Sequence, residues 1–188
     1  MSTKFLLIVV LFCSFLGIAQ EANKEESVSV KKVASQSLKQ KFPSKVLNAY
    51  QENSKSKVED LFSYFQLLTD GNLKADVKKE VIDNIHLLVQ NPNVLVVDFT
   101  SDSLHKIPLQ QFIQKLLISE PISFSISDEV SYDTVAYQSW NANYTVTKTK
   151  SGIVTKTKVT ENVFFYETSK QFGNEAKVVI ATLLGAMN

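Results

Sequence analysis

The chain has 188 residues, of which 44% are hydrophobic, and its 20 basic and 19 acidic residues give a formal net charge of +1. It contains no arginine, the residue preferred for bidentate phosphate contacts, and its balanced charge argues against a strongly basic nucleic-acid-binding surface. A single cysteine, Cys13, excludes an intramolecular disulfide framework and a zinc site built from several cysteines.

The first twenty residues have the layout of a secretory signal peptide. Lys4 precedes an apolar run over residues 5–18, and the small residues Gly17 and Ala19 suit a cleavage site. The run is shorter than the roughly 20 apolar residues that a transmembrane helix needs. We therefore predict a signal peptide at residues 1–19, no transmembrane segment, and a secreted protein that is extracellular, or periplasmic in a bacterial host.

Residues 20–53 form a polar leader in this interpretation. The stretch is rich in lysine, glutamate, serine and glutamine and poor in large apolar residues, which predicts a flexible or loosely helical segment. Its lysines leave open a basic arm that binds anionic surfaces. A single folded domain is then expected over residues 54–188, a length sufficient for one hydrophobic core.

Apolar residues at helical spacing predict three helices. They run from about Ser54 to Asp70, from about Ala75 to Asn91, and from Pro108 to Leu117. A β-rich run over residues 94–99 predicts a short strand between the second and third helices, covered on both faces.

The period of the apolar pattern changes from 3.6 to 2 after Pro121. Strands are predicted over residues 122–126, 130–150, 153–167 and 177–184, with turns at Ser151-Gly152 and Gly173-Asn174. Helices followed by an antiparallel meander indicate an α+β domain in which a curved sheet packs over the helices.

This order of elements resembles the NTF2-like (SnoaL-like, cystatin-related) superfamily over about residues 54–184. The resemblance rests on the segments SKVEDLFSYFQLL, ADVKKEVIDNIHLLV, NVLVVDF, PLQQFIQKLL and ISFSIS. The ending FFYETSKQFGNEAKVVI is also similar to the small secreted NTF2-like proteins of nematodes. The resemblance implies a cone, with three N-terminal helices packed against a curved antiparallel sheet. Its open end would hold a small molecule or be filled by side chains.

The resemblance also implies where a catalytic pair would lie. Isomerase-like members of the superfamily use a tyrosine on the first helix and a carboxylate near the first strand, and Tyr64 and Asp98 occupy those places. A desolvated Asp98 with a raised pKa would act as a base, while Tyr64 would donate to an oxyanion. The preferred alternative is structural, because Tyr64 flanks an apolar stripe and Asp98 begins a polar loop.

Aromatic residues on the long predicted strand suggest a ligand pocket. Tyr132, Trp140 and Tyr144 share parity, so they and the neighbouring Asn143 are our candidates to line a pocket for a small apolar ligand. The simpler alternative is that the aromatic rings fill the core between sheet and helices. Asn143 also begins an N-glycosylation sequon, which matters in a eukaryotic host.

Four lysines of one parity flank the predicted turn at residues 151–152. We expect Lys148, Lys150, Lys156 and Lys158 to cluster at the hairpin tip, where they would protect a sheet edge from aggregation. The competing hypothesis is that they bind anionic glycans or a membrane surface.

These patterns favour a secreted, non-enzymatic binding or interaction protein that holds a small apolar ligand in its cone or contacts a protein partner. The alternative is a small isomerase- or dehydratase-like enzyme that uses Tyr64 and Asp98. No cofactor is predicted, and neither His86 nor His105 has a ligand partner at a metal-binding spacing. A homodimer formed through the sheet is left open.

Overall fold

The structure is a computed structural model that describes residues 43–127, 129–133 and 138–188. The predicted signal peptide and the predicted leader up to residue 42 lie outside the described residues. The chain divides into two compact units, and the second, Lys45–Asn188, contains the fold discussed below.

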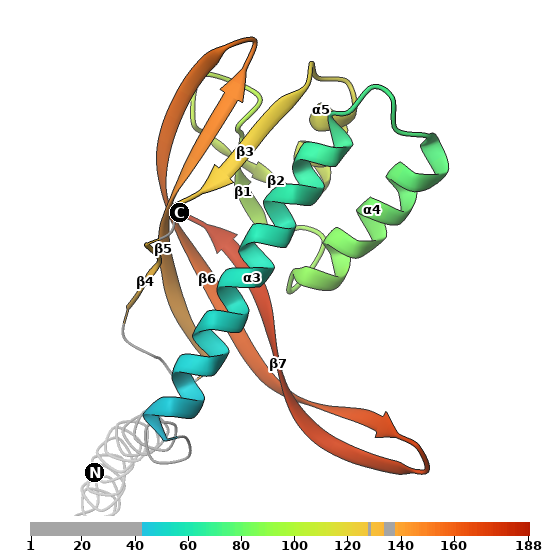
Figure 1. Cartoon of the computed structure of the whole chain (residues 1–188), viewed down its shortest axis with the longest axis vertical. Helices are drawn as coiled ribbons and strands as arrows, with labels where there is room; N and C mark the ends of the chain where they lie inside the picture. The colour runs from blue at the N-terminus through green and yellow to red at the C-terminus, as the bar shows by residue number, and fades with distance from the viewer. Residues whose placement is uncertain (1–42, 128, 134–137) are drawn as a thin grey trace, which may run out of the picture. The chain divides into compact units, whose positions relative to one another are not determined.

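The described residues contain three helices, α3 (Ser44–Leu68), α4 (Ala75–Leu88) and α5 (Leu109–Leu117) (Figure 1). Helix α3 begins well before the predicted start near Ser54. Its first turns contain lysine, glutamine, glutamate and alanine, which favour helix even where they face solvent. The part of the predicted leader from Ser44 onward is therefore helical and continuous with the domain.

A separate two-stranded antiparallel sheet joins β1 (Leu95–Val97) to β2 (Lys106–Pro108). The first strand was predicted. The second was not, because a three-residue strand that buries only Ile107 leaves almost no periodic pattern. Pro108 ends β2 in an extended conformation and serves as the N-cap of α5.

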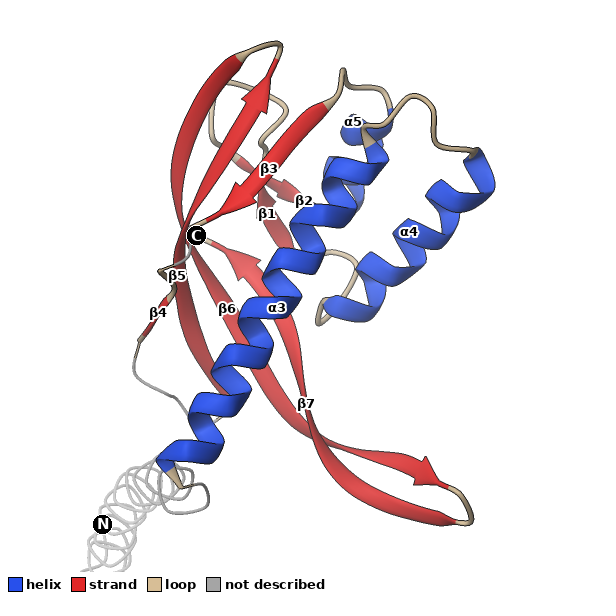
Figure 2. Cartoon of the chain, in the orientation of Figure 1, coloured by secondary structure: helices blue, strands red, loops and turns tan. Residues whose placement is uncertain are grey.

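The main sheet has five antiparallel strands in the order β3-β5-β6-β7, with β4 paired to β5. The strands are β3 (Ile122–Ile126), β4 (Ser131–Tyr132), β5 (Ser139–Lys150), β6 (Ile153–Phe172) and β7 (Glu175–Met187). The sheet is strongly curled, and α3 runs along it (Figure 2). The predicted α+β class, with one antiparallel sheet after the helices, is confirmed.

Aromatic side chains fill the interior between α3 and the sheet. Phe62 of α3 makes edge-to-face contacts with Phe99 and Phe124 at ring-centroid distances of 5.5 and 5.6 Å, and with Tyr144 of β5 at 6.2 Å. Phe65, one turn away, contacts Phe62 at 5.5 Å. Such contacts stabilise by about 0.5–1.5 kcal/mol each beyond the burial of apolar area.

The β5–β6 hairpin overturns the predicted lysine cluster. Residues 151–152 both have positive φ, 49° and 82°, as a tight two-residue turn requires. Lys148 pairs with Thr155, whereas Lys156 pairs with Thr147, and cross-strand partners share a face of the sheet. The faces therefore carry separate pairs, Lys148 with Lys150 and Lys156 with Lys158. In this register an even-numbered residue of β5 always pairs with an odd-numbered residue of β6. Lysines with even numbers on both strands therefore lie on opposite faces, although we expected them to cluster.

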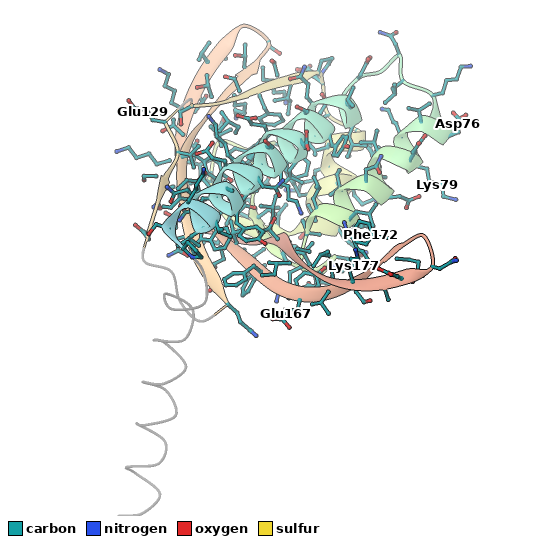
Figure 3. The ribbon with its side chains drawn as sticks, turned by 60° about the horizontal axis from the view of Figure 1, so that its bottom comes forward. Asp76, Lys79, Glu129, Glu167, Phe172 and Lys177 are labelled. Atoms are coloured by element: carbon teal, nitrogen blue, oxygen red, sulfur yellow. The ribbon has the colours of Figure 1, made fainter. Side chains whose placement is uncertain are left out.

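Strands β6 and β7 extend as a hairpin past the end of β5. The last residue of β6 that pairs with β5 is Phe164, whereas β6 pairs with β7 from Glu161 to Phe172. Figure 3 labels Glu167, Phe172 and Lys177 on this extension. Lys170 and residues 180–182 of this hairpin face α3 and form one wall of the candidate site.

Candidate ligand-binding site

A cavity of about 740 Å³ lies between the N-terminal half of α3 and the β6–β7 hairpin. Helix α3 lines it with Lys45, Val46, Ala49, Tyr50, Asn53 and Lys57, and the hairpin with Lys170, Ile180, Ala181 and Thr182. The volume falls within the range of about 300–1,000 Å³ that is usual for small-molecule sites.

Helix α3 presents two different faces to the rest of the domain. Its C-terminal half buries Val58, Leu61, Phe62, Phe65 and Leu68 in the core. Its N-terminal half turns Val46, Ala49, Tyr50 and Asn53 toward the cavity. These residues recur at intervals of three or four positions, which places them on one side of a helix. One continuous helix thus contributes both a core face and a cavity wall.

Apolar and aromatic residues form part of each wall of the cavity. Val46, Ala49 and Tyr50 on the helix side face a lining that includes Ile180 and Ala181 of β7. Val46 remains 38% exposed in this arrangement. Covering such a surface with an apolar molecule is favourable, at about 25 cal/mol per Å² removed from water.

Three lysines supply the charge of the cavity. Lys57 is half-buried, and its ammonium donates a hydrogen bond to the backbone carbonyl of Thr182. Burial lowers the pKa of Lys57, and the positive charge of Lys170 lowers it further, while Asp60 acts in the opposite direction. Among the described residues, no acidic side chain lines the cavity, and the ion pairs formed there do not involve Lys45, Lys57 or Lys170.

A buried acid that we did not predict lies on the inward face of the sheet. The hydroxyl of Tyr144 donates a 2.7 Å hydrogen bond to Glu161 Oε2, and both side chains are buried. Burial raises the pKa of Glu161 from 4.5 to about 8, although the bond from Tyr144 acts against that rise. Within the described residues, Glu161 Oε1 and Trp140 Nε1 have no hydrogen-bond partner. Glu161 shares parity with Val159 and Val163, so the alternation of β6 could have indicated its inward position.

The four predicted pocket residues do not line this cavity. Trp140 and Tyr144 share the buried face of β5, as their parity predicted, and Trp140 packs on Phe165 with ring centroids 5.5 Å apart. Asn143 lies on the opposite face, where it accepts a hydrogen bond from Thr160. Tyr132 donates its hydroxyl to the Gln51 carbonyl of α3 at 2.8 Å. The side chains of Trp140, Tyr144 and Tyr132 therefore have structural contacts.

Asp98 is held by a set of donors at the end of β1. Its carboxylate accepts hydrogen bonds from Lys115 Nζ at 2.6 Å and from the Thr100 amide and hydroxyl at 3.0 and 2.6 Å. His105 Nε2 lies 3.4 Å from Asp98 Oδ2. Burial alone would raise the pKa of Asp98, but the bonds from Lys115 and Thr100 outweigh it and the pKa is lowered. The raised pKa that the isomerase-like alternative requires of Asp98 is therefore not present.

Tyr64 lies half-buried on α3, and neither Tyr64 nor Asp98 lines the cavity. Within the described part of the chain, the polar contacts of the Asp98 carboxylate are those with Lys115, Thr100 and His105. Tyr64 is not among them, so the structure does not bring the two predicted catalytic residues together through a hydrogen bond.

A second, smaller cavity of about 380 Å³ lies between α4 and α5. It is lined by Ile82, His86, Gln110, Gln111, Ile113 and Gln114. His86 Nε2 is buried there without a hydrogen-bond partner among the described residues. The described part of the chain contains no group of three or more histidine, cysteine or acidic residues arranged to hold a metal ion.

No helix in residues 43–127, 129–133 or 138–188 combines the length and the apolar character needed to cross a membrane. Comparison of the chain with protein-family models, with curated proteins and with solved structures finds no match.

Proposed function

We propose that this chain is a secreted, non-enzymatic binding protein that holds a small, largely apolar molecule between α3 and the β6–β7 hairpin. The observation that carries the proposal is the cavity of about 740 Å³, which is lined by apolar residues together with lysine, asparagine and threonine side chains. This combination is typical of small-molecule sites. The ligand lies beside α3 rather than against the aromatic face of β5, since Phe62 packs on Tyr144 there.

The environment of Asp98 favours this proposal over an isomerase-like enzyme. A general base needs a lone pair within reach of substrate, and an elevated pKa close to the working pH. The carboxylate of Asp98 instead accepts bonds from Lys115 and Thr100, which lower its pKa. These bonds tie the start of the 99–105 loop to α5, which is a structural role.

We also propose that the domain is a variant of the NTF2-like cone. The strongly curled antiparallel sheet and the long helix α3 along it support this assignment. The β1–β2 sheet and the extended β6–β7 hairpin would be its additions.

Binding of a neutral apolar probe tests the proposed function. N-phenyl-1-naphthylamine should bind the purified chain saturably, with a rise in fluorescence. Ala49→Trp places a large ring in the cavity and should weaken binding by at least about tenfold, a loss of about 1.4 kcal/mol. The control is Ala75→Trp, at an exposed position of α4 outside the cavity lining. Absence of binding, or equal binding by both variants, would contradict the proposal.

A further inference from the structure

We infer that the ligand is an anionic amphiphile, whose apolar tail lies along α3 and whose carboxylate is bound by Lys57 and Lys170. The inference rests on the proposed function and specifies the class of molecule that the cavity accepts. It is carried by the lysines of the cavity lining, by the fixed position of one of them, and by the apolar residues that lie between Val46 and Lys57.

The described part of the cavity lining concentrates positive charge and contains no carboxylate. Its charged residues are Lys45 and Lys57 from α3 and Lys170 from β6. Lys57 and Lys170 are close enough to repel each other, and the nearby Asp60 offsets this only in part. A bound anion would replace that repulsion with two attractions.

Lys57 is positioned as a binding group rather than as a freely moving surface lysine. It is half-buried, and its hydrogen bond to the Thr182 carbonyl fixes the ammonium beside β7. An ammonium has three donors, so this bond leaves donors for a ligand oxygen. The Thr182 hydroxyl is itself bonded to Asn53 Oδ1 at 3.3 Å, which further orders this wall of the cavity.

Two of the three lysines, Lys57 and Lys170, can reach one ligand head, while Lys45 lies next to Val46 at the start of α3. Lys57 lies eleven residues after Val46, which corresponds to roughly 16 Å along the helix axis. Between them Ala49 and Tyr50 face the cavity, as do Ile180 and Ala181 from β7. An extended tail of medium length can follow this apolar stretch while its head reaches Lys57 and Lys170. Lysines favour a point-charge contact, whereas bidentate recognition of phosphate favours arginine.

Competition between two ligands that share a tail provides the test. Dodecanoate and dodecanol are each titrated against bound N-phenyl-1-naphthylamine on the purified chain and on the Lys57→Gln/Lys170→Gln double variant. Dodecanoate should bind the unmodified chain at least about tenfold more tightly than dodecanol. The double variant should lose that preference, with dodecanol binding unchanged. Lys79→Gln, at an exposed position of α4, is the control that should retain it.

The single variant Lys170→Gln tests the same contact in a chain that should fold normally, because Lys170 is exposed and its side chain is not part of the core. It should weaken dodecanoate severalfold without altering dodecanol. Equal affinities for the two ligands, or a preference that survives removal of Lys57 and Lys170, would overturn this inference and leave the binding function standing. Failure of the probe and of both ligands to bind would overturn the proposed function itself.

Discussion

Tyr144 and Glu161 place a hydrogen-bonded acid inside the sheet face that packs against α3. An ionised carboxylate in such surroundings would lack solvation, so the group is stable there chiefly as the neutral acid. The phenol of Tyr144 satisfies one carboxyl oxygen and is itself covered by Phe62. This pair therefore couples the stability of the interior to pH.

The stability of the protein should fall as the pH rises from about 4.5 to about 8 because of Glu161. Its pKa is raised by burial to about 8, so the folded state retains a proton that the unfolded chain has already released. The associated stability is complete below pH 4.5 and is lost as the pH approaches about 8. Thermal unfolding of Glu161→Gln, measured from pH 5 to 9, should lack this part of the decline.

The matched control is Glu80→Gln, at an exposed position of α4, which should follow the unmodified chain at every pH. Parallel pH profiles for Glu161→Gln and the unmodified chain would show that Glu161 does not hold its proton in the folded state.

Among individual residues, the positions of some could be predicted from the sequence and those of others could not. The inward position of Trp140 and Tyr144 follows from strand parity, and that of Glu161 could have been inferred in the same way. The proximity of Lys57 to Lys170 could not have been inferred from the sequence. They belong to elements far apart in the chain, and their proximity depends on how the β6–β7 hairpin meets α3.

Helix α3 is the element that connects the core to the proposed site. Its C-terminal half is fixed by apolar burial, and its N-terminal half continues the same helix along the cavity. Packing of the first half therefore positions the second. A change that loosens the core face should also weaken ligand binding, without touching the cavity.

Phe65→Ala tests that core face. Phe65 is fully buried and contacts Phe112 of α5 at a ring-centroid distance of 5.0 Å. Its truncation should lower the free energy of unfolding by about 3–5 kcal/mol, measured by urea denaturation, because a cavity replaces a packed ring. Leu67→Ala, on the same helix but 40% exposed, should change it by less than about 1 kcal/mol. Similar losses for the two variants would contradict the assigned core face.

Strong periodicity made α4, α5 and β3 predictable, because each buries one regular face or stripe. The start of α3 was missed because Val46, Ala49 and Tyr50 stand among many polar residues, and Val46 and Ala49 remain exposed rather than entering the core. The lysine cluster was misplaced because parity fixes faces within a strand, whereas the register of the β5–β6 turn fixes them between strands.

At the scale of the folded unit, the cavity is assembled from both ends of the described chain. The N-terminal half of α3 supplies one wall, and β6 and β7 supply the other. The unit closes around its core through the Val89–Leu184 bridge and the Gln90 amide bond to Leu184. Ile180, Ala181 and Thr182, in the middle of β7, come just before Leu184 and line the cavity.

A crystal structure of the protein with bound dodecanoate tests the central claim most directly. We predict that the tail lies between α3 and the β6–β7 hairpin, against Val46, Ala49 and Ile180. The carboxylate should lie within hydrogen-bonding distance of Lys57 Nζ, with Lys170 beside it. A ligand bound elsewhere, or a hairpin packed against α3 with no space between them, would contradict the account.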